Sequence, residues 1–340
     1  YFPMSTRLVG IEVFKGPSST RHGPYTVGGA INVLTRDIGS ENQFFADVSL
    51  GQRNMKKTHV YSSVLGDTTG ILIEGVNLSS DGFKVLDSGG PTGFDRNELM
   101  LKSEWLVNAD QRLELKLGYA TEESNETYLG LSLSDYNNDP YRRYSASSLG
   151  NMSWKRTQAE LEWTGRIGNQ IRVRSVAYHH WLNRSWTKFN RFSGGVDTHK
   201  LLQQEPGGQS AVYLAILRGE EDTLTDDQRL MIGTNFRVFH SFGWQTTAEW
   251  SKKTDTYSSS LELGLRVHGD HVRRTHTEDP YAMVDGLLES TGIPTLTVLD
   301  SVATAQAVAL HLHEDLSIGK AHFFPGVRME IIRGWRENID

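Results

Sequence analysis

Histidine is the residue type in this sequence whose spacing comes nearest to a metal-binding pattern. The candidates are the pair His179-His180, the pair His311 and His313, and the histidines within residues 268–276. His311 and His313 share one face of an expected strand, which is compatible with coordination, because histidine-rich tracts can hold a metal ion. No supporting cluster of other ligands accompanies them, so we expect no metal site.

Motifs of enzymatic chemistry are missing from the sequence. Cysteine is absent, which excludes disulfides, zinc-thiolate sites and cysteine nucleophiles. There is no nucleophile elbow, phosphate loop or zinc-protease motif, and the pair Gly28-Gly29 lacks a dinucleotide-binding context. The acidic residues 220–222, with Asp226 and Asp227, fit a solvated surface loop better than a cation site. We therefore expect neither an enzyme nor a bound cofactor.

From about residue 43 onward, apolar and charged residues alternate with a period of two. Leu113, Leu115 and Leu117, for example, alternate with Glu114 and Lys116. This period predicts strands with one apolar face and one charged face. A soluble antiparallel sandwich is the alternative, but its strands usually run about 5–6 residues. The alternating runs here have about 10 residues or more, which is near the length that a tilted membrane-spanning strand needs.

The alternation predicts about eleven strands, and the connections between them alternate in length. The expected strands lie near residues 43–53, 57–66, 70–80, 95–107, 111–123, 153–167, 170–187, 229–252, 259–274, 302–317 and 321–335. Short connections fall at 66–70, 108–111, 168–169 and 319–320, and long ones at 83–94, 126–152, 188–228 and 276–301. Short turns on one side and long loops on the other are typical of outer-membrane β-barrels. The strand at 70–80 is the least regular, because Leu72 and Val76 share their parity with Glu74.

Composition and charge agree with a protein that is apolar on one face only. The 340-residue chain is 37% hydrophobic and 10% aromatic, and it contains 33 glycines. Its formal net charge of −6 gives no reason to expect nucleic-acid binding. No run of about 20 apolar residues is present, so crossing a membrane would require a closed β-barrel. The chain begins at Tyr1 without a signal peptide and stops at Asp340, and we interpret both ends as truncations.

Residues 1–38 differ from the rest in having short strands and glycine-rich turns. Residues 11–19 read I-E-V-F-K-G-P-S-S, Gly23 follows, and residues 27–36 read V-G-G-A-I-N-V-L-T-R. This pattern resembles the end of the plug domain of TonB-dependent outer-membrane receptors, whose barrel begins directly after it. Glycine permits positive φ and close backbone approach, so we expect the motif residues to shape the plug rather than contact a ligand. They are Gly16, Pro17, Gly23, Gly28, Gly29 and Asn32.

A second resemblance narrows the subfamily. Residues 139–144, 268–279 and 312–330 look like the barrel of ferric-citrate-type receptors. The resemblance implies an all-β fold: the C-terminal part of a plug domain at residues 1–38, then about half of a large, 22-stranded antiparallel transmembrane β-barrel at residues 39–340. Half a barrel leaves two long open edges, which are aggregation sites, so we do not expect this piece to fold alone.

The resemblance also implies a function in the bacterial outer membrane. The protein would import a ferric chelate, ferric citrate or another siderophore, into the periplasm without chemical change. Its partners would be outer-membrane lipid, the chelate, and the TonB-ExbB-ExbD complex through a region missing from this sequence, but no nucleic acid. On the same scaffold the ligand could instead be cobalamin, a nickel chelate or an oligosaccharide. A passive porin, which the plug motif argues against, and a signalling or surface receptor are the remaining alternatives.

A carboxylate-rich anionic ligand would need arginine forks on the outer loops or on the upper wall of the lumen. Under the resemblance, the barrel candidates are Arg142, Arg143, Arg184, Arg191, Arg273 and Arg274, and the plug candidates are Arg21 and His22. Each of them could instead be a solvated loop charge or the partner of a nearby carboxylate. We expect the ligand site to draw on some of these residues.

Overall fold

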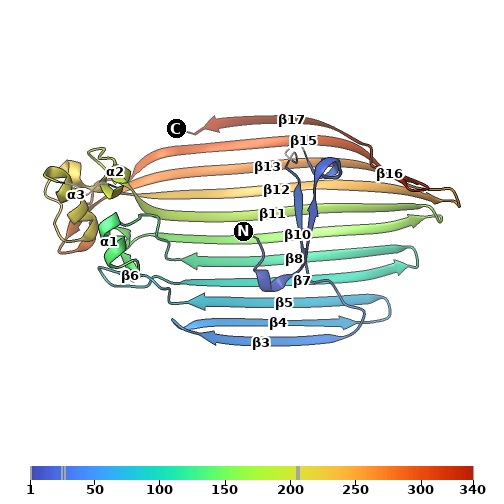
Figure 1. The fold of residues 1–340 in the computed structure, drawn as a ribbon, viewed down its shortest axis with the longest axis horizontal. Coiled ribbons are helices and arrows are strands. Elements are labelled where there is room, and N and C mark those ends of the chain that lie inside the picture. Colours follow the sequence, from blue (N-terminus) through green and yellow to red (C-terminus); the bar gives the residue numbers. More distant parts are fainter. Residues whose placement is uncertain (1, 24–25, 27, 204–206, 340) are drawn as a thin grey trace.

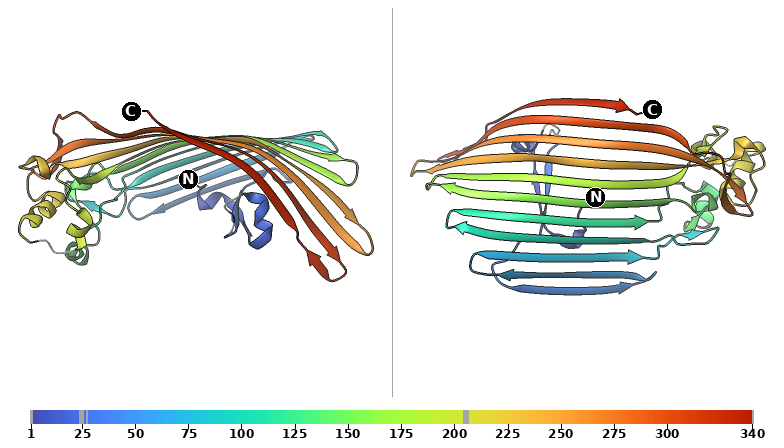
Figure 2. Two further views of the ribbon diagram at one scale, coloured as in Figure 1. Left: turned by 90° about the horizontal axis from the view of Figure 1, so that it is seen from above. Right: turned by 180° about the vertical axis from the view of Figure 1, so that it is seen from behind.

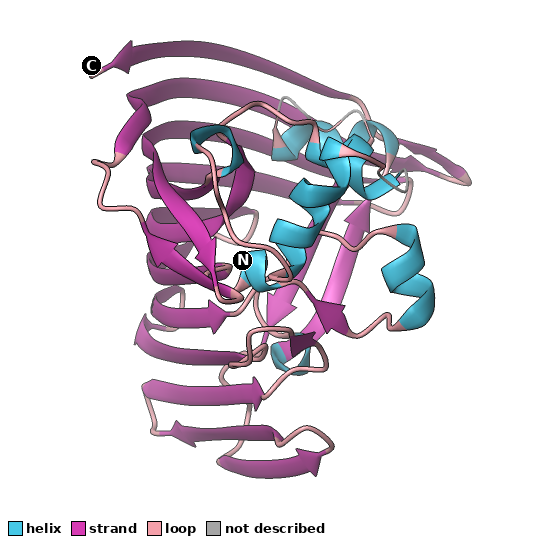
Figure 3. Cartoon of the chain, turned by 90° about the vertical axis from the view of Figure 1, so that its left-hand side faces the viewer, coloured by secondary structure: helices cyan, strands magenta, loops and turns pink. Residues whose placement is uncertain are grey.

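The computed structural model describes residues 2–23, 26, 28–203 and 207–339, with the backbone alone for Pro17, Ser18, Thr20 and Gln209. Most of the chain forms one large antiparallel sheet whose long strands follow one another in sequence order (Figure 1). The sheet is curved, and a small N-terminal unit lies on its concave side (Figure 2). The α-helices gather beyond one end of the strands (Figure 3).

Within the described part of the chain, thirteen strands belong to the large sheet. They are β3 (Gln43–Gly51), β4 (Met55–Leu65), β5 (Thr69–Ser80), β7 (Phe94–Asn108), β8 (Gln111–Ser124), β10 (Asn151–Ile167), β11 (Ile171–Phe192), β12 (Leu230–Lys253), β13 (Tyr257–Val284), β14 (Leu287–Ser290), β15 (Leu296–Ile318), β16 (Ala321–Phe323) and β17 (Gly326–Asn338). The sequence predicted about eleven strands. The difference lies in two short ones: β14 folds back on the far end of β13, and Phe324 and Pro325 separate β16 from β17, which both pair with β15.

The two faces of the sheet differ in polarity, because successive residues of a strand point to opposite sides. Glu74, Glu98 and Glu262 point to the concave side, where they contact the N-terminal unit. The neighbouring apolar side chains face the convex side, where Ile73 is 51% and Leu263 is 54% exposed. A broad exposed apolar surface of this kind marks contact with a partner or a membrane.

Strand β5 departs from simple alternation, as its sequence indicated. Leu72 and Val76 share the concave face with Glu74, and all three are buried. The N-terminal unit covers this part of the inner wall, and the backbone N–H of Met4 donates to Glu98 nearby at 3.0 Å. A covered patch of the inner wall can therefore carry apolar residues.

The strands extend well past the length that a membrane requires on the side away from the short turns. β12 has 24 residues and β13 has 28, whereas a tilted membrane strand needs about 9–11. The long connection expected at residues 276–301 is therefore much shorter. β13 continues to Val284 and β15 begins at Leu296, because the two strands keep pairing beyond the expected ends.

The long connections fold into a compact structure at that end, which we call the outer cap. It contains α1 (Leu133–Asn138), α2 (Thr198–Gln203), α3 (Gln209–Arg218), the 3-10 helices η3 (Ser145–Ser147) and η4 (Asp226–Gln228), and the parallel pair β6 (Val85–Leu86) and β9 (Arg142–Arg143). Its apolar core includes Phe189, Phe192, Ile216, Leu217 and Met283. The sequence analysis predicted loops here and no helices. None of the helices in the described ranges has the length and apolar character to cross a membrane.

The N-terminal unit is a hairpin with two short 3-10 helices. Its elements are η1 (Ser5–Arg7), β1 (Leu8–Phe14), η2 (Gly16–His22) and β2 (Ala30–Thr35), and β1 pairs with β2 in antiparallel register. Asn32 donates its side-chain amide to Glu12 across the pair at 2.8 Å. Gly16 begins η2 with φ of +65°, and Gly23 ends it. The side chain of Pro17, the remaining member of that turn, lies outside the described part.

Gly29 is the motif glycine at which a side chain meets the strongest obstacle. Its φ is +117°, and an added Cβ would lie 2.6 Å from the carbonyl oxygen of Phe14, whereas Gly28 faces open space. We expect Gly29→Ala to destabilise the hairpin by about 1–3 kcal/mol through backbone strain, and Gly28→Ala to change it little. Hydrogen exchange of the β1 amides measures both variants. Equal protection in the two would contradict this expectation.

Candidate functional site

A buried ionic cluster around Arg7 fixes the N-terminal unit to the sheet. The Arg7 guanidinium donates to Glu74 on β5 at 3.0 Å and to Glu98 on β7 at 2.6 Å, and no side chain of the three is more than 4% exposed. His59 on β4 contacts the other oxygen of Glu74 at 2.9 Å, and Arg96 contacts Glu98 at 2.6 Å. Buried charges persist when they are paired and hydrogen-bonded. This Arg7 cluster therefore defines where the unit sits on the wall.

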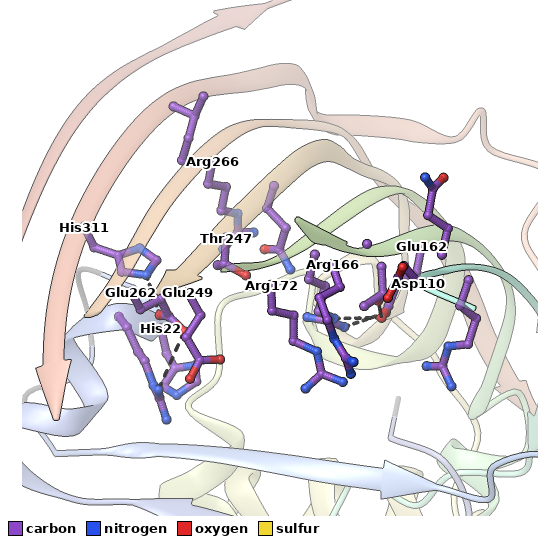
Figure 4. A pocket seen from close by; sticks show the side chains of 18 of the residues that line it. His22, Asp110, Glu162, Arg166, Arg172, Thr247, Glu249, Glu262, Arg266 and His311 are labelled. Carbon is purple, nitrogen blue, oxygen red and sulfur yellow. Dashed lines mark hydrogen bonds and ion pairs between the residues drawn. The ribbon is translucent and has the colours of Figure 1, made fainter. Parts of the chain in front are cut away.

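A cavity of about 790 Å³ lies between the N-terminal unit and the sheet, toward the short turns (Figure 4). Arg21 and His22 reach it from η2, and strands β10 to β13 form the opposite wall. Among the described residues that line it, seven are arginines and four are acidic. The arginines are Arg21, Arg112, Arg166, Arg172, Arg174, Arg266 and Arg328. Positive charge therefore dominates this basic cavity.

Part of the charge in the basic cavity is neutralised internally. Arg174 forms a two-pronged contact with Glu162 at 2.7 and 2.9 Å. His311 contacts Glu262 at 2.8 Å, and the guanidinium of Arg21 lies 4.0 Å from the same carboxylate. In the part of the chain that the structure describes, no three or more histidine or acidic side chains are placed to hold a metal ion.

Three arginines form a row across the concave face between the basic cavity and the outer cap. Arg184 on β11 is directly opposite Arg237 on β12, which is directly opposite Arg274 on β13. Arg172 and Glu262 line the basic cavity. Arg184 is an even number of residues from Arg172 on β11, and Arg274 is an even number from Glu262 on β13, so the row faces the same side as the cavity. Directly opposed residues have Cβ atoms about 4.5–5.5 Å apart, and like charges at that distance repel. This arginine row therefore favours a multivalent anion.

Aromatic and cationic side chains adjoin the arginine row on its outer-cap side. The guanidinium carbon of Arg184 lies 5.9 Å from the ring centroid of Trp186. Trp186 meets Tyr128 edge to face at 5.3 Å, and the ammonium of Lys188 lies 3.3 Å from the Tyr128 centroid. Such cation–π groups combine apolar contact area with positive charge. The site can thus bind the organic part of a ligand beside its anionic groups.

Comparison with known proteins finds similar folds among solved structures only. No protein-family model and no curated protein sequence matches the chain. The ferric citrate transporter FecA in its unliganded form matches with a TM-score of 0.70 and 19% identity, over 97% of this chain and 43% of FecA. The siderophore receptor PiuA from Acinetobacter baumannii matches with a TM-score of 0.73 and 11% identity, over 97% of this chain and 48% of PiuA. The ferric-catecholate import receptor Fiu from E. coli K12, in its open form, matches with a TM-score of 0.66 and 15% identity, over 96% of this chain and 50% of Fiu.

This chain has the fold of the TonB-dependent siderophore receptors. The resemblance expected from the sequence is thereby confirmed for the fold. The chain spans half or less of the length of the three receptors. These receptors are transport proteins rather than enzymes.

Four of the predicted site residues lie at the basic cavity or in the arginine row, on the concave side of the sheet. Arg21 and His22 line the basic cavity, and Arg184 and Arg274 belong to the arginine row. Adjacent residues of a strand face opposite sides, so Arg273 cannot accompany Arg274. Arg273 lies on the convex face, where it contacts Asp300 at 3.1 Å, and we leave it out of the concave-face site.

The other three predicted arginines lie beyond the arginine row, toward or within the outer cap. Arg142 contacts Asp87 and Asp135 at 3.0 Å each. Arg143 is 1% exposed, and its guanidinium donates to backbone carbonyls of residues 125, 126, 147 and 150. Arg191 contacts Glu278 at 2.8 Å. The contacts of Arg142 and Arg143 tie parts of the outer cap together, and that of Arg191 joins β11 to β13. We leave these three arginines out of the proposed ligand site.

Sequence reasoning missed Arg237 and most arginines of the basic cavity. A signal for Arg237 was present, because it alternates with the outward-facing residues Phe236 and Val238. Its place opposite Arg184 and Arg274 depends on the register of three strands, which the sequence alone does not supply. Predicting the arginines of the basic cavity would also have required the position of the N-terminal unit on the sheet.

Asp135 is the carboxylate on which several parts of the outer cap converge. It accepts hydrogen bonds from Tyr144, from Ser132 at 3.0 Å and from Arg218 at 2.8 Å. Burial alone would raise the pKa of Asp135, but the hydrogen bonds from these three side chains outweigh burial and hold the pKa below its ordinary value of 3.8. A carboxyl whose pKa is lower in the folded state stabilises that state above the unfolded pKa, and this stabilisation is lost as the pH falls through the folded value.

We therefore expect the outer cap to loosen below about pH 4. The measurement is the hydrogen-exchange protection factor of the α3 amides at pH 7 and at pH 3, and Asp135→Asn should remove the acid-dependent step. Burial raises the pKa of the neighbouring Asp87, so this carboxyl acts in the opposite sense. Asp87→Asn is the matched control and should leave the step in place. An acid step that persists in Asp135→Asn would assign it to another group.

Proposed function

We propose that residues 1–38 are the end of a plug domain and residues 39–340 about half of a transmembrane β-barrel of about 22 strands. The whole protein would import an anionic ferric chelate across a bacterial outer membrane and release it unchanged into the periplasm. The apolar convex face and the charged concave face support this placement, because outer-membrane barrels are apolar toward lipid and polar toward the lumen. TonB-dependent remodelling of the plug would supply the driving force.

The arginine row is the observation that carries the ligand class. Guanidinium groups bind carboxylates through two parallel hydrogen bonds. The row covers three neighbouring strands, a width of about 10 Å at the usual strand spacing. That width and the repetition of the fork fit a compact ligand with several carboxylates, such as ferric dicitrate. Trp186 and Tyr128 would flank the ligand on the side of the outer cap.

The basic cavity provides the next binding region along the same strands. β11 carries Arg184 in the row and Arg172 at the cavity, and β13 carries Arg274 and Arg266 in the corresponding places. Between the two regions, the hydroxyl of Tyr178 lies 2.9 Å from Arg266. An anion that leaves the row would pass the apolar side chains of Leu182, Phe239 and Val272 and then reach the donors of the basic cavity, once the N-terminal unit moves.

The decisive experiment is a binding comparison with the full-length receptor in detergent. Ferric dicitrate, a ferric catecholate and cobalamin would be titrated separately by calorimetry. We expect ferric dicitrate to bind most tightly. Preferential binding of the catecholate or cobalamin would support the import function and reject a carboxylate-rich chelate as the ligand. Binding of none of the three would favour a nickel chelate, an oligosaccharide, a porin or a surface receptor.

A further inference from the structure

The convex face carries a row of histidines that the proposed import function does not use. His179 on β11, His240 on β12 and His271 on β13 lie side by side. The His179 and His240 rings approach to 3.3 Å between nitrogens, and the His240 and His271 ring centroids are 6.2 Å apart. His271 also contacts the hydroxyl of Thr304 on β15 at 3.3 Å. His240 has the parity of Phe242, which is 49% exposed on the convex face, so this histidine row points away from the lumen.

The histidine row stands at the boundary of the apolar band. On β12, ten residues separate His240 from Trp250 near the short turn. Ten residues of a strand tilted by about 45° rise about 23 Å, close to the apolar height of an outer-membrane barrel. Trp181 on β11 lies opposite His240, and beyond it the outward residues of β11 and β13 are polar, whereas β12 continues with Val238 and Phe236. The row therefore faces the headgroup region of the outer leaflet.

An apolar groove of about 950 Å³ runs along the convex face below the histidine row. Leu161, Trp244, Val267 and Val308 are among its walls, and small residues such as Ala177 leave room between them. Alanines and glycines lie between bulky side chains of neighbouring strands and leave the space that forms the groove. Its apolar lining fits an acyl chain better than a polar ligand.

Polar side chains from three strands border this groove on the side of the histidine row. His179 lines it on β11, and Gln306 and Arg333 line it on β15 and β17. Arg333 on β17 lies three strand spacings from His240 on β12 and two residues farther toward the short turns, a distance of about 16 Å. Imidazole and guanidinium N–H groups both donate to phosphate oxygens. A headgroup with one phosphate could reach one of the two positions, and a headgroup with two phosphates could reach both.

We propose that the groove and the histidine row bind one membrane lipid with a doubly phosphorylated headgroup. An acyl chain lies in the groove, one phosphate contacts the histidine row, and the second contacts Arg333. Arg273, two residues beyond His271, is already held by Asp300 at 3.1 Å and is not part of the site. This inference rests on the proposed placement of the chain in the outer membrane, but it does not depend on the imported ligand.

Native mass spectrometry of the full-length receptor in detergent tests the lipid site. The probes are diphosphoryl lipid A, monophosphoryl lipid A and phosphatidylcholine. We expect one tightly bound lipid, with diphosphoryl lipid A at least ten-fold tighter than phosphatidylcholine, and at least a ten-fold loss in the variant His179→Gln, His240→Gln, His271→Gln. His322→Gln, an exposed histidine beside the short turn, is the matched control. Equal binding of phosphatidylcholine, or an unaffected triple variant, would overturn the proposal.

A second variant keeps the test decisive if the triple variant does not fold. Arg333→Gln alone should remove the preference for the diphosphoryl over the monophosphoryl lipid, and a preserved preference would overturn the proposal. Ferric dicitrate binding is measured on the same samples. Chelate binding without specific lipid binding rejects the lipid site alone, and specific lipid binding without chelate binding rejects the proposed ligand alone.

Discussion

Replacing Arg184, Arg237 and Arg274 together by glutamine is expected to weaken the binding of ferric dicitrate to the full-length receptor by at least a hundred-fold. A hydrogen bond to a charged group contributes about 1.5–3 kcal/mol, so the loss of one arginine alone corresponds to about a ten- to hundred-fold change in Kd. The three opposed guanidinium groups act on one ligand, and their effects need not add. Calorimetry with the purified receptor measures the change.

The matched control for this experiment is Arg273→Gln. Arg273 is the neighbour of Arg274 in the chain but lies on the convex face, so its replacement changes net charge without touching the lumenal row. Arg237→Lys tests geometry separately, because lysine keeps the charge and loses the two-pronged fork. Undiminished ferric dicitrate binding in the triple variant, or an equal loss of binding in Arg273→Gln, would show that the ligand does not bind at the arginine row.

Arg7→Ala is expected to release the N-terminal unit from the wall. The substitution leaves Glu74 and Glu98 buried without their shared cation, and the loss of one partner from a buried ion pair costs about 3–5 kcal/mol. Arg96 and His59 remain beside the two carboxylates and would offset part of this. Hydrogen exchange of the β1 amides should accelerate accordingly, while exchange in β12 and β13 stays unchanged.

Two further variants separate the contribution of charge from that of packing. Arg7→Met combined with Glu74→Gln and Glu98→Gln removes all three charges and should recover much of the protection lost in Arg7→Ala. Arg21→Ala is the matched control, because its contact with Glu262 is long, at 4.0 Å, and about a third of the Arg21 side chain is exposed. Unchanged β1 protection in Arg7→Ala would show that other contacts hold the unit.

The sequence predicted the strands and their polarity because both depend on local periodicity. Leu113 and Glu114 are adjacent in β8, so their side chains point to opposite faces of the strand in any tertiary fold. The arginine row depends instead on register: Arg184 and Arg274 were candidates, but only strand pairing brings Arg237 between them. Arg142 and Arg143 were candidates because an anionic ligand needs arginines. In the structure, both contact groups of the outer cap. The helices of the outer cap escaped prediction because their apolar residues form a core only when several loops meet.

Two attachments of the N-terminal unit to the sheet differ in strength, and this difference sets the order in which the two would fail under load. One end is bound to β5 and β7 through the buried Arg7 cluster, and the other reaches β13 and β17 through the long Arg21–Glu262 contact and a hydrogen bond from Arg328 to the Arg21 carbonyl at 3.2 Å. A pulling force would detach the weak end first. The unit would then swing about the Arg7 cluster as a hinge, which opens the basic cavity while the chain remains tethered to the wall.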